Sequence, residues 1–389
     1  MIDWGLIRQR FPASRRRVHL AAMVLSSHAD FLSRTIDAHR AGLDDDADTY
    51  VRSRGRQEMR RFAVAAGQYF GVPPELVAEV GNTTLGLGAV YSGLRLAAGQ
   101  RILTTDHDFV STLAPLEARH RRDGTPVDRI RLFDATDALD ESAIVQAVVD
   151  AVRPETRLVA LTWVHSSTGV KIPIAAVSRA LAALNDGRAD AERVLLSVDG
   201  VHGFGVEDET FGSLGCDVFV SGCHKWIYGP RGTGVVYATE AAWASVEPIA
   251  APTGSATPGL QHSPMGVHSY ELRWAAADAF DDLRTIGKAA VMARVHGLAE
   301  RLKRDLMTLP RVRMITPLDR AFSSGVVCFD YDGARPDDVV THLGARDVVG
   351  SVSSADCLAE GGRHVRLSPS LMNDEADFAR VLDALRAYP

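Results

Sequence analysis

The chain has few cysteines, no long apolar run and no excess of basic residues. Its four cysteines, Cys216, Cys223, Cys328 and Cys357, form no C-x-x-C pair, which argues against a disulfide framework or a zinc ribbon. No apolar run approaches the roughly 18 residues of a membrane span. The N-terminus carries charge where a secretory signal needs an apolar core. From the cysteines, the N-terminus and the lack of a membrane span, we expect a cytoplasmic protein with no membrane partner. The net charge of −6 argues against a nucleic-acid partner.

A chain of 389 residues can form two domains or one large α/β unit. Short apolar runs alternate with helical patterns, which is typical of a mostly parallel sheet covered on both faces. The predicted strands are 77–80, 101–105, 128–133, 157–164, 193–198, 217–220 and 234–238. The predicted helices between them are 85–98, 109–122, 141–152 and 174–184.

The sequence before this region predicts an irregular arm up to about residue 25. Two helices are then predicted, at 29–39 and 56–70, with an acidic turn at 44–48 between them. Gly71, with prolines beyond it, is a good C-terminal stop for the second helix.

Pro, Gly, Ser and Thr accumulate over 250–266, which marks the predicted domain boundary. We expect a large domain, 1–260, that includes the N-terminal arm, and a smaller α+β domain, 261–389. The elements predicted in the smaller domain are a long helix at 275–309, strands near 325–330 and 364–367, and a final helix at 375–387.

Lys225 lies between two apolar strands, in the segment 221–234 that reads S-G-C-H-K-W-I-Y-G-P-R-G-T-G. A lone lysine there is usually an exposed residue of a hairpin loop. However, the preceding predicted strand ends on Asp199, with His202 three residues later. A lysine and an aspartate at the ends of successive strands suit a pyridoxal phosphate site. The amine forms a Schiff base with the cofactor aldehyde, and the carboxylate keeps the ring nitrogen protonated.

Asn82, Thr83 and Thr84 follow a strand and open a helix. Backbone N–H groups and hydroxyls at a helix N-terminus can seat a phosphate, although an ordinary N-cap is the alternative. The glycines that follow lack the third member of the dinucleotide fingerprint, because Tyr91 stands in its place. We therefore reject a nucleotide-binding oxidoreductase.

Three more polar residues occupy strands or strand ends. His107 follows the strand 101–105 and could lie over an aromatic cofactor, or be structural. Ser166 belongs to a polar cluster that could bond a phenolic oxygen. Arg366 lies inside an apolar strand, where an inward guanidinium needs an anion such as a substrate carboxylate.

The chain resembles the fold-type I pyridoxal phosphate enzymes of the class V aminotransferase family. The resemblance rests on D-G-V-H at 199–202, H-K-W-x-x-G-P-R-G-T-G at 224–234 and V-R-L-S-P at 365–369. The pattern is closest to the isopenicillin N epimerase-like branch, which is also similar to the cysteine desulfurases. It covers roughly residues 15–389 and implies a homodimer.

The resemblance implies a role for each motif residue. Lys225 would be the Schiff-base and catalytic lysine, and Arg366 would bind the substrate carboxylate. Asp199 would be the partner of the ring nitrogen, and His202 that of the ring hydroxyl. His107 would stack on the ring and act as a second catalytic group. The other implied cofactor contacts are Asn82, Thr83, Thr84, Ser166, Ser221 and His224.

The chain departs from the desulfurase pattern at three places. Ser353 aligns with the nucleophilic cysteine of desulfurases, and Cys357 is close but out of register. Gly222 stands where desulfurases have a phosphate-binding serine, with Ser221 one step away as the alternative. The Gly-Thr pair through which a partner subunit reaches the phosphate is replaced by H-S-Y-E-L-R-W at 268–274.

The expected reaction forms a carbanion at the α-carbon of an amino acid, with the amine of Lys225 as the base. Our first expectation is β-elimination from a cysteine-derived substrate, a C–S lyase reaction. Epimerisation or transamination is the alternative, and a non-catalytic pyridoxal phosphate-binding protein is the alternative of another class. Arg54 and Tyr270 are candidate substrate-pocket residues, each as consistent with a packing or surface role.

Overall fold

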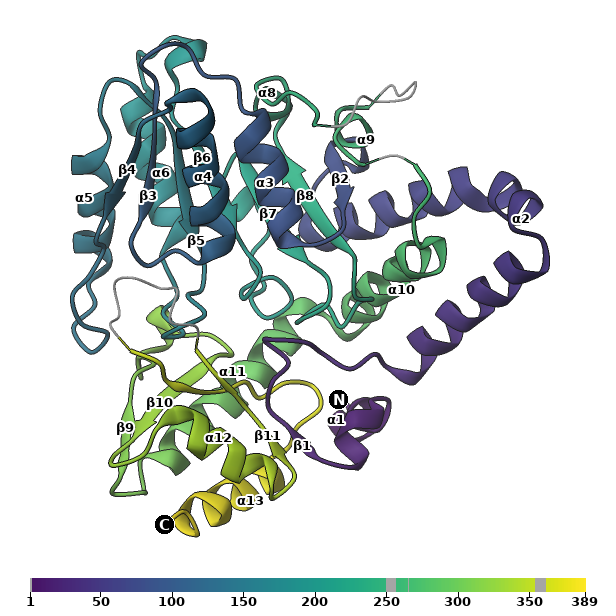
Figure 1. The fold of residues 1–389 in the computed structure, drawn as a ribbon, viewed down its shortest axis with the longest axis vertical. Helices are drawn as coiled ribbons and strands as arrows, with labels where there is room; N and C mark the ends of the chain where they lie inside the picture. Colours follow the sequence, from purple (N-terminus) through teal and green to yellow (C-terminus); the bar gives the residue numbers. More distant parts are fainter. Residues whose placement is uncertain (1, 250–256, 265, 354–361) are drawn as a thin grey trace.

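The computed structural model describes residues 2–249, 257–264, 266–353 and 362–389. At its centre is a seven-stranded sheet with the order β2-β8-β7-β6-β5-β3-β4 (Figure 1). Only β8 runs antiparallel to its neighbours, β2 and β7, among the described strands of this sheet. The predicted mostly parallel seven-stranded sheet is confirmed. Its strands are β2 (Val77–Val80), β3 (Arg101–Thr105), β4 (Val127–Ile130), β5 (Thr156–Thr162), β6 (Leu195–Asp199), β7 (Val218–Gly222) and β8 (Gly234–Ala238).

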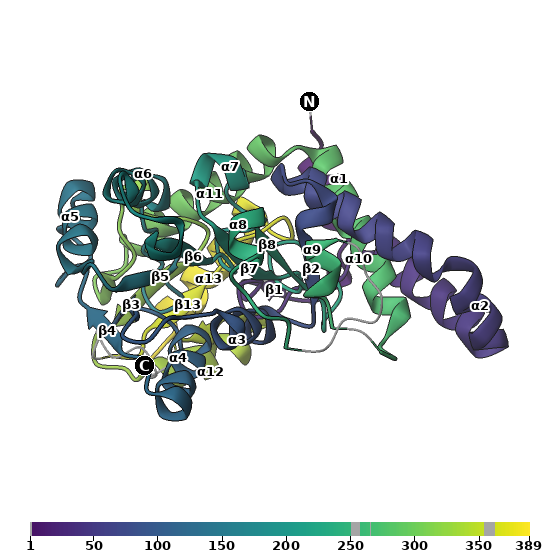
Figure 2. The same cartoon turned by 90° about the horizontal axis from the view of Figure 1, so that it is seen from above.

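Helices cover both faces of this sheet, and its central strands are therefore buried along their whole length. Side chains of α3 and α4 share one apolar core with the sheet, and those of α5 and α6 share another. Figure 2, seen from above, shows the two helix pairs on opposite sides of the strands. Their bounds are α3 (Thr83–Gly93), α4 (Val110–Asp123), α5 (Glu141–Ala151) and α6 (Ile174–Asn185).

The predicted pair of N-terminal helices is one long element, α2 (Asp30–Phe70), with a break at Asp46. Asp46 has φ −156° and ψ 87°, and its carboxylate accepts a hydrogen bond from the Thr49 N–H at 3.1 Å. The predicted turn spans five residues, 44–48, whereas the observed break involves Asp46 alone. Its side chain caps the second half of the helix, so no longer turn is needed. The helix ends at Gly71, which adopts a left-handed φ of 75° as its predicted stop.

The predicted helix 275–309 is wrong in its continuity. It consists of α10 (Tyr270–Ile286) and α11 (Lys288–Leu306), which are separated at Gly287 with φ 95° and ψ 125°. Only glycine adopts such a backbone conformation without a steric penalty, so the chain changes direction there. As a result α10 packs along α2, and both project from the sheet, whereas α11 covers the second sheet (Figure 1).

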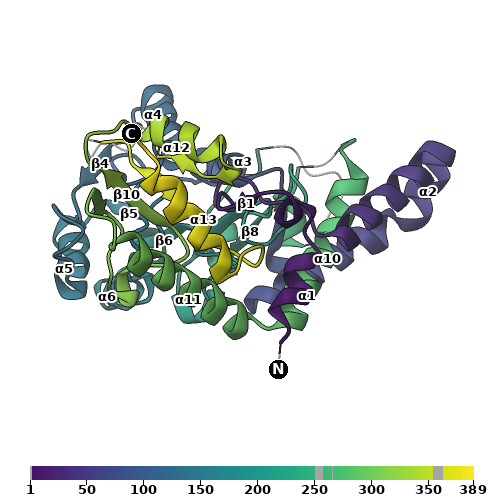
Figure 3. The same cartoon turned by 90° about the horizontal axis from the view of Figure 1, so that it is seen from below.

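The second sheet is antiparallel, with the order β12-β13-β10-β9. Figure 3, seen from below, shows α12 and α13 on the same side of the molecule as this second sheet. The N-terminal arm is not irregular: it contains a helix, α1, and a strand, β1, that pairs in parallel with β11. The elements are α1 (Trp4–Gln9), β1 (Val18–His19), β9 (Val312–Met314), β10 (Val327–Tyr331), α12 (Pro336–Gly344), β11 (Val348–Val349), β12 (Ser351–Val352), β13 (Val365–Leu367) and α13 (Glu375–Arg386).

Three short helices fill connections around the large sheet: α7 (Phe211–Leu214), α8 (Glu240–Trp243) and α9 (Pro258–Gln261). The predicted boundary segment, 250–266, lies partly outside the described residues, so the division after residue 260 stays a prediction. In the described part of the chain, no helix has both the length and the apolar character needed to cross a membrane.

Candidate active site

Lys225 lies in a tight loop just beyond the carboxyl end of β7. The loop is closed by hydrogen bonds from the Cys223 N–H to the Thr233 carbonyl, at 3.0 Å, and from the Gly229 N–H to the Cys223 carbonyl, at 2.8 Å. The Lys225 Nζ lies 3.3 Å from the Nε2 of His202. Burial lowers the pKa of Lys225 to about 8, the Asp199 charge opposes this shift and the Arg366 charge adds to it. The amine therefore loses its proton far more readily near physiological pH than an ordinary lysine does.

Asp199 is the last residue of β6 and is 2% exposed. Its Oδ1 accepts a hydrogen bond from the Val201 N–H at 3.1 Å. Burial raises the pKa of Asp199 to about 6, against the Val201 hydrogen bond and the Lys225 charge. Burial also holds the pKa of His202 well below its ordinary value, and the nearby cationic groups lower it further. His202 is therefore a neutral imidazole beside the amine.

The predicted phosphate seat lies at the start of α3. Asn82 is the N-cap, and its side-chain oxygen accepts from the Leu85 N–H at 2.9 Å. The buried Thr83 Oγ1 and His224 Nδ1 have no hydrogen-bond partner among the described residues. Thr84 Oγ1 lies 3.0 Å from Ser111 Oγ. Donors without partners at a helix N-terminus suit a bound phosphate group.

The structure explains why Gly222 replaces the serine of desulfurases. A Cβ at this position would lie 2.7 Å from the His224 ring and 3.2 Å from Thr83 Oγ1. Ser221, the alternative phosphate ligand, is fully buried, and its hydroxyl donates to the Gly222 carbonyl at 3.1 Å. The structure therefore does not bring the Ser221 side chain to the pocket. The predicted phosphate seat retains Thr83, Thr84 and His224, together with the backbone N–H groups that open α3.

His107 lines the pocket and stacks on Phe133, with 4.0 Å between the ring centroids and an interplanar angle of 19°. The next residue, Asp108, is fully buried and accepts four hydrogen bonds. Three come from Thr104 and Thr105 at the end of β3, and one comes from the Thr162 N–H of β5 at 2.7 Å. Asp108 thus holds two strand ends together and fixes the backbone beside His107.

Arg366 reaches the same pocket from β13 of the second sheet. One of its terminal nitrogens donates to the Ser166 carbonyl at 2.8 Å, and its buried Nε has no hydrogen-bond partner among the described residues. Burial lowers the pKa of Arg366, although the group stays cationic. A half-satisfied guanidinium facing the pocket is suited to a carboxylate.

Ser353, which aligns with the desulfurase cysteine, lines the pocket but is fully buried. Its Oγ accepts from the His364 N–H at 2.7 Å, which fixes the backbone before β13. Arg363 lies nearby and pairs with both carboxylate oxygens of Asp337, at 2.7 and 3.0 Å. Cys357 lies outside the described residues.

The structure does not bring Arg54 or Tyr270 to the pocket. Arg54 lies over the Tyr50 ring on α2, and Tyr270 packs against Trp274 at the start of α10. Both belong to the projecting α2–α10 pair. Their prediction rested on loop position alone, whereas helix packing decides where these side chains point.

The cavity has a volume of about 410 Å³. Sequence reasoning missed some of its residues: Met23 and Val24 of the N-terminal arm have no local signal, because only long-range packing places them there. Phe109 and Ser111 follow the predicted His107 and could have been found by extending that motif. The cavity is lined by Met23, Val24, Asn82, Thr83, Thr84, His107, Phe109, Ser111, Thr162, Ser166, Asp199, Val201, His202, His224, Lys225, Val352, Ser353, Arg363 and Arg366.

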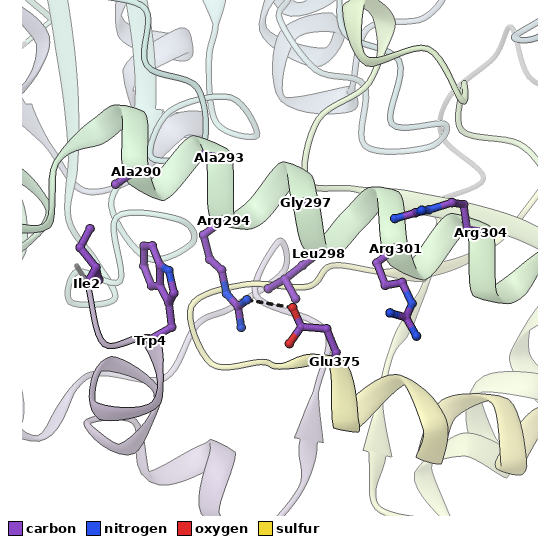
Figure 4. Close-up of a pocket in the computed structure, with 10 residues that line it drawn as sticks. All are labelled: Ile2, Trp4, Ala290, Ala293, Arg294, Gly297, Leu298, Arg301, Arg304 and Glu375. Carbon is purple, nitrogen blue, oxygen red and sulfur yellow. Dashed lines mark hydrogen bonds and ion pairs between the residues drawn. The ribbon is translucent and has the colours of Figure 1, made fainter.

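A larger hollow, of about 570 Å³, lies between α1 and α11 (Figure 4). Two of its three lining arginines have partners, since Arg294 pairs with Glu375 and Arg301 with Asp305, and none of its lining residues has a buried polar atom without a partner among the described residues. This hollow therefore lacks the buried unpaired donors that distinguish the Lys225 cavity. We place the active site at Lys225.

Comparison with known proteins gives the family of the chain. The family model for class V aminotransferases matches residues 66–380. The chain belongs to the class V aminotransferase family. Membership of this family makes it a pyridoxal phosphate-dependent enzyme, which confirms the predicted cofactor and enzyme class.

Two relatives resemble most of the chain. Isopenicillin N epimerase of Streptomyces clavuligerus is 26% identical over 389 residues, covering 95% of this chain and 89% of the relative. A probable cysteine desulfurase of Vibrio cholerae is 24% identical over 370 residues, covering 88% and 86%.

Solved structures show the same fold. A C-DES variant with glycine covalently linked to the PLP cofactor has a TM-score of 0.89 and 21% identity, and covers 100% of both chains. A complex of the cystine C–S lyase C-DES with cysteine persulfide has a TM-score of 0.86 and 21% identity, covering 97% of this chain and 99% of that chain.

The residues of the cavity fit the class V cofactor. Buried polar atoms without partners among the described residues would bind polar groups of the cofactor: Thr83 Oγ1 and His224 Nδ1 at the helix end, and His202 Nδ1 in the ring that faces the lysine. The amine of Lys225 is partly neutral and Asp199 provides a buried carboxylate. Thr83, Thr84 and His224 would hold the phosphate, and Asp199 and His202 would hold the ring.

Proposed function

We propose that the protein is a C–S lyase that catalyses β-elimination from a cysteine-derived amino acid. Bound pyridoxal phosphate supplies an electron sink for charge that develops at the α-carbon. Arg366 binds the substrate carboxylate and so orients the Cα–H bond. Lys225, with its lowered pKa, accepts the Cα proton. The Cβ–S bond then breaks with its electron pair on sulfur, and the thiolate takes up a proton.

After the thiol leaves, water hydrolyses the released enamine to pyruvate and ammonia. The reaction needs no external oxidant or reductant. His107, Asp199 and His202 hold the cofactor beside the amine. Arg366 accommodates the substrate carboxylate, and the proton that Lys225 accepts is available to the leaving thiolate.

The observation that carries this proposal is the environment of Ser353. A desulfurase transfers sulfur to an exposed cysteine thiolate, but here the aligned serine is buried and its oxygen is bonded to the His364 N–H. The three cysteines in the described part of the chain are also buried, and burial raises the pKa of Cys223 to about 12. None of the cysteines in the described residues is exposed to accept sulfur, which supports a reaction in which sulfur leaves with the product. The cystine C–S lyase C-DES, which has the same fold, supports this chemistry.

Epimerisation is the second candidate, because the likeness to isopenicillin N epimerase covers 95% of the chain. An epimerase returns the proton to the other face of the α-carbon, and His107 is the pocket residue that we would assign to that role. Transamination would return the proton to the cofactor instead. A homodimer and a cytoplasmic location stay predictions of the family resemblance and of the scarce cysteines.

The test supplies the holoenzyme with S-substituted cysteines, including cystine, and with other L-amino acids in ²H₂O. A lyase releases pyruvate and a thiol or persulfide in equal amounts over many turnovers. Inversion at Cα with deuterium incorporation and no keto acid would instead establish the epimerase. Keto acid formed in a single turnover, with sulfur retained, would identify an aminotransferase.

A further inference from the structure

A second buried polar cluster lies around Glu207, whose side chain is 1% exposed. The Glu207 Oε2 accepts from the Lys171 Nζ at 3.0 Å. Its Oε1 lies 2.7 Å from the His296 Nε2 and accepts a short hydrogen bond from the Ser324 hydroxyl. Burial raises the pKa of Glu207, but the His296 and Ser324 hydrogen bonds and the Lys171 charge outweigh burial, and the pKa lies below its usual range. The cluster thus contains an ionised carboxylate with three partners.

These partners belong to different parts of the fold. Glu207 ends the turn that begins with Asp199 and contains His202. Lys171 closes the hairpin that contains Ser166, through the bridge between Val164 and Lys171. His296 lies on α11, and Ser324 lies three residues before β10. One carboxylate therefore joins the cofactor side of the pocket to the second sheet.

Together with Arg366, these contacts close a ring around the pocket. Arg366 donates to the Ser166 carbonyl of the hairpin, and Cys328 of β10 pairs with Arg366 of β13. The Lys171 N–H also donates to the Phe322 carbonyl, at 2.9 Å. The hairpin and the second sheet are thus fixed to each other at the pocket by Arg366 and behind it by Glu207.

The turn that ends at Glu207 has little freedom to compensate for a lost contact. A Cβ on Gly203 would lie 2.3 Å from the Trp163 ring. Gly205 has φ 97°, and a Cβ there would lie 2.6 Å from the backbone of Trp226, the neighbour of Lys225. Because the turn is packed so closely between the hairpin and the lysine loop, a shift at Glu207 moves both.

We propose that Glu207 is a positioning residue that sets the place of Arg366 relative to Lys225, and so the grip on the substrate carboxylate. The carboxylate touches neither cofactor nor substrate, and acts through Lys171 and Ser324. The inference rests on the proposed role of Arg366 as the carboxylate-binding residue.

The test compares glycine with glycinamide, which lacks the carboxylate, through the change that each causes in the visible absorbance of the holoenzyme. In the wild type, we expect glycine to bind more tightly than glycinamide. The dissociation constant of glycinamide divided by that of glycine then reports the Arg366 contact. We expect Glu207→Gln to lower this ratio about tenfold by weakening glycine binding alone. Lys171→Met removes one partner and keeps the His296 contact, so it should lower the ratio less, and Glu207→Asp should restore part of it.

The control is Lys303→Met, which alters a buried lysine of α11 that bonds to Pro317 and Ser323 and not to Glu207. It should leave the ratio unchanged even where the melting temperature falls. A wild-type ratio in Glu207→Gln, or, if that variant does not fold, in Lys171→Met, would overturn the positioning role. A wild-type protein that does not prefer glycine would instead refute the assignment of Arg366.

Discussion

The half-buried Lys225 and the buried Lys303 both have a pKa lowered to about 8, chiefly because burial disfavours the charged amine. Lys303 donates to the Pro317 carbonyl at 2.8 Å and to the Ser323 hydroxyl at 2.9 Å. Among the described residues, the Lys225 Nζ has one hydrogen-bond partner, the His202 Nε2, at 3.3 Å. A lowered amine pKa therefore marks burial, and the availability of the amine decides which lysine can react.

The surroundings of the two lysines differ in the same way. The Lys303 Nζ has two hydrogen-bond partners in the chain, and none of these groups has a buried atom without a partner among the described residues. Around Lys225, Thr83, His202, His224 and Arg366 all keep a buried polar atom without a partner among the described residues. Such atoms cost stability unless a ligand satisfies them. The amine of Lys303 is therefore occupied by its neighbours, whereas the polar atoms around Lys225 are available to a cofactor and a substrate.

The sharpest test of this contrast is to replace each lysine by methionine. Lys225→Met should lose all covalent attachment of pyridoxal phosphate, because the cofactor aldehyde has no other amine in the pocket. Lys303→Met should retain the attachment and lose about 1–3 kcal/mol of stability, since it leaves two buried acceptors unpaired. Borohydride reduction followed by peptide mass mapping measures the first, and thermal unfolding measures the second. An adduct on Lys303 in the wild type would break the comparison.

Arg366→Leu should weaken the binding of amino-acid substrates about 100-fold, because a charged partner of the carboxylate is removed from a buried site. Cofactor affinity should stay near that of the wild type. Arg366→Lys should recover only part of the loss, since an ammonium cannot make the paired contact of a guanidinium. Substrate titrations followed by absorbance measure both. Equal losses for cofactor and substrate would mean that Arg366 is structural.

Gly222→Ser should lower pyridoxal phosphate affinity about tenfold, because overpacking of this kind costs about 1–3 kcal/mol. The added side chain would displace His224 and crowd Thr83. The matched control is Gly212→Ala in α7, where a Cβ meets nothing within 4 Å. If the serine variant bound the cofactor more tightly, the seat would have room for the desulfurase arrangement, and our explanation of Gly222 would fail.

The smallest effects should appear in pH profiles. The rate at which the apoprotein captures pyridoxal phosphate should rise with pH around a midpoint near 8, since the neutral amine reacts. Asp199 raises the pKa of Lys225 and Arg366 lowers it, so Asp199→Asn should move the midpoint down and Arg366→Leu should move it up. Lys303→Met should not move it. A midpoint near the ordinary lysine value would show that Lys225 is well solvated.

The pattern of apolar runs was sufficient to predict the central sheet, because strands buried on both faces leave an unbroken apolar signature. It was also sufficient to predict that Asp199, His107 and Lys225 would meet, since parallel strands bring their carboxyl ends to one edge. The continuous helix 275–309 and the irregular N-terminal arm were wrong. One glycine and one parallel pairing between β1 and β11 decide those regions, and neither leaves a periodic signal.

The amino-acid sequence was enough to predict the groups available for chemistry: a lysine, an aspartate, a phosphate seat and an arginine, each attached to a recognisable local element. Which of these groups lack partners among the described residues became visible only in the folded chain, as did the fact that Met23 and Val24 reach the pocket while Arg54 and Tyr270 do not. The physical reason is the separation along the sequence over which each interaction acts. Strand and helix signals are local, whereas burial and hydrogen-bond satisfaction depend on segments hundreds of residues apart, such as Ser166 and Arg366.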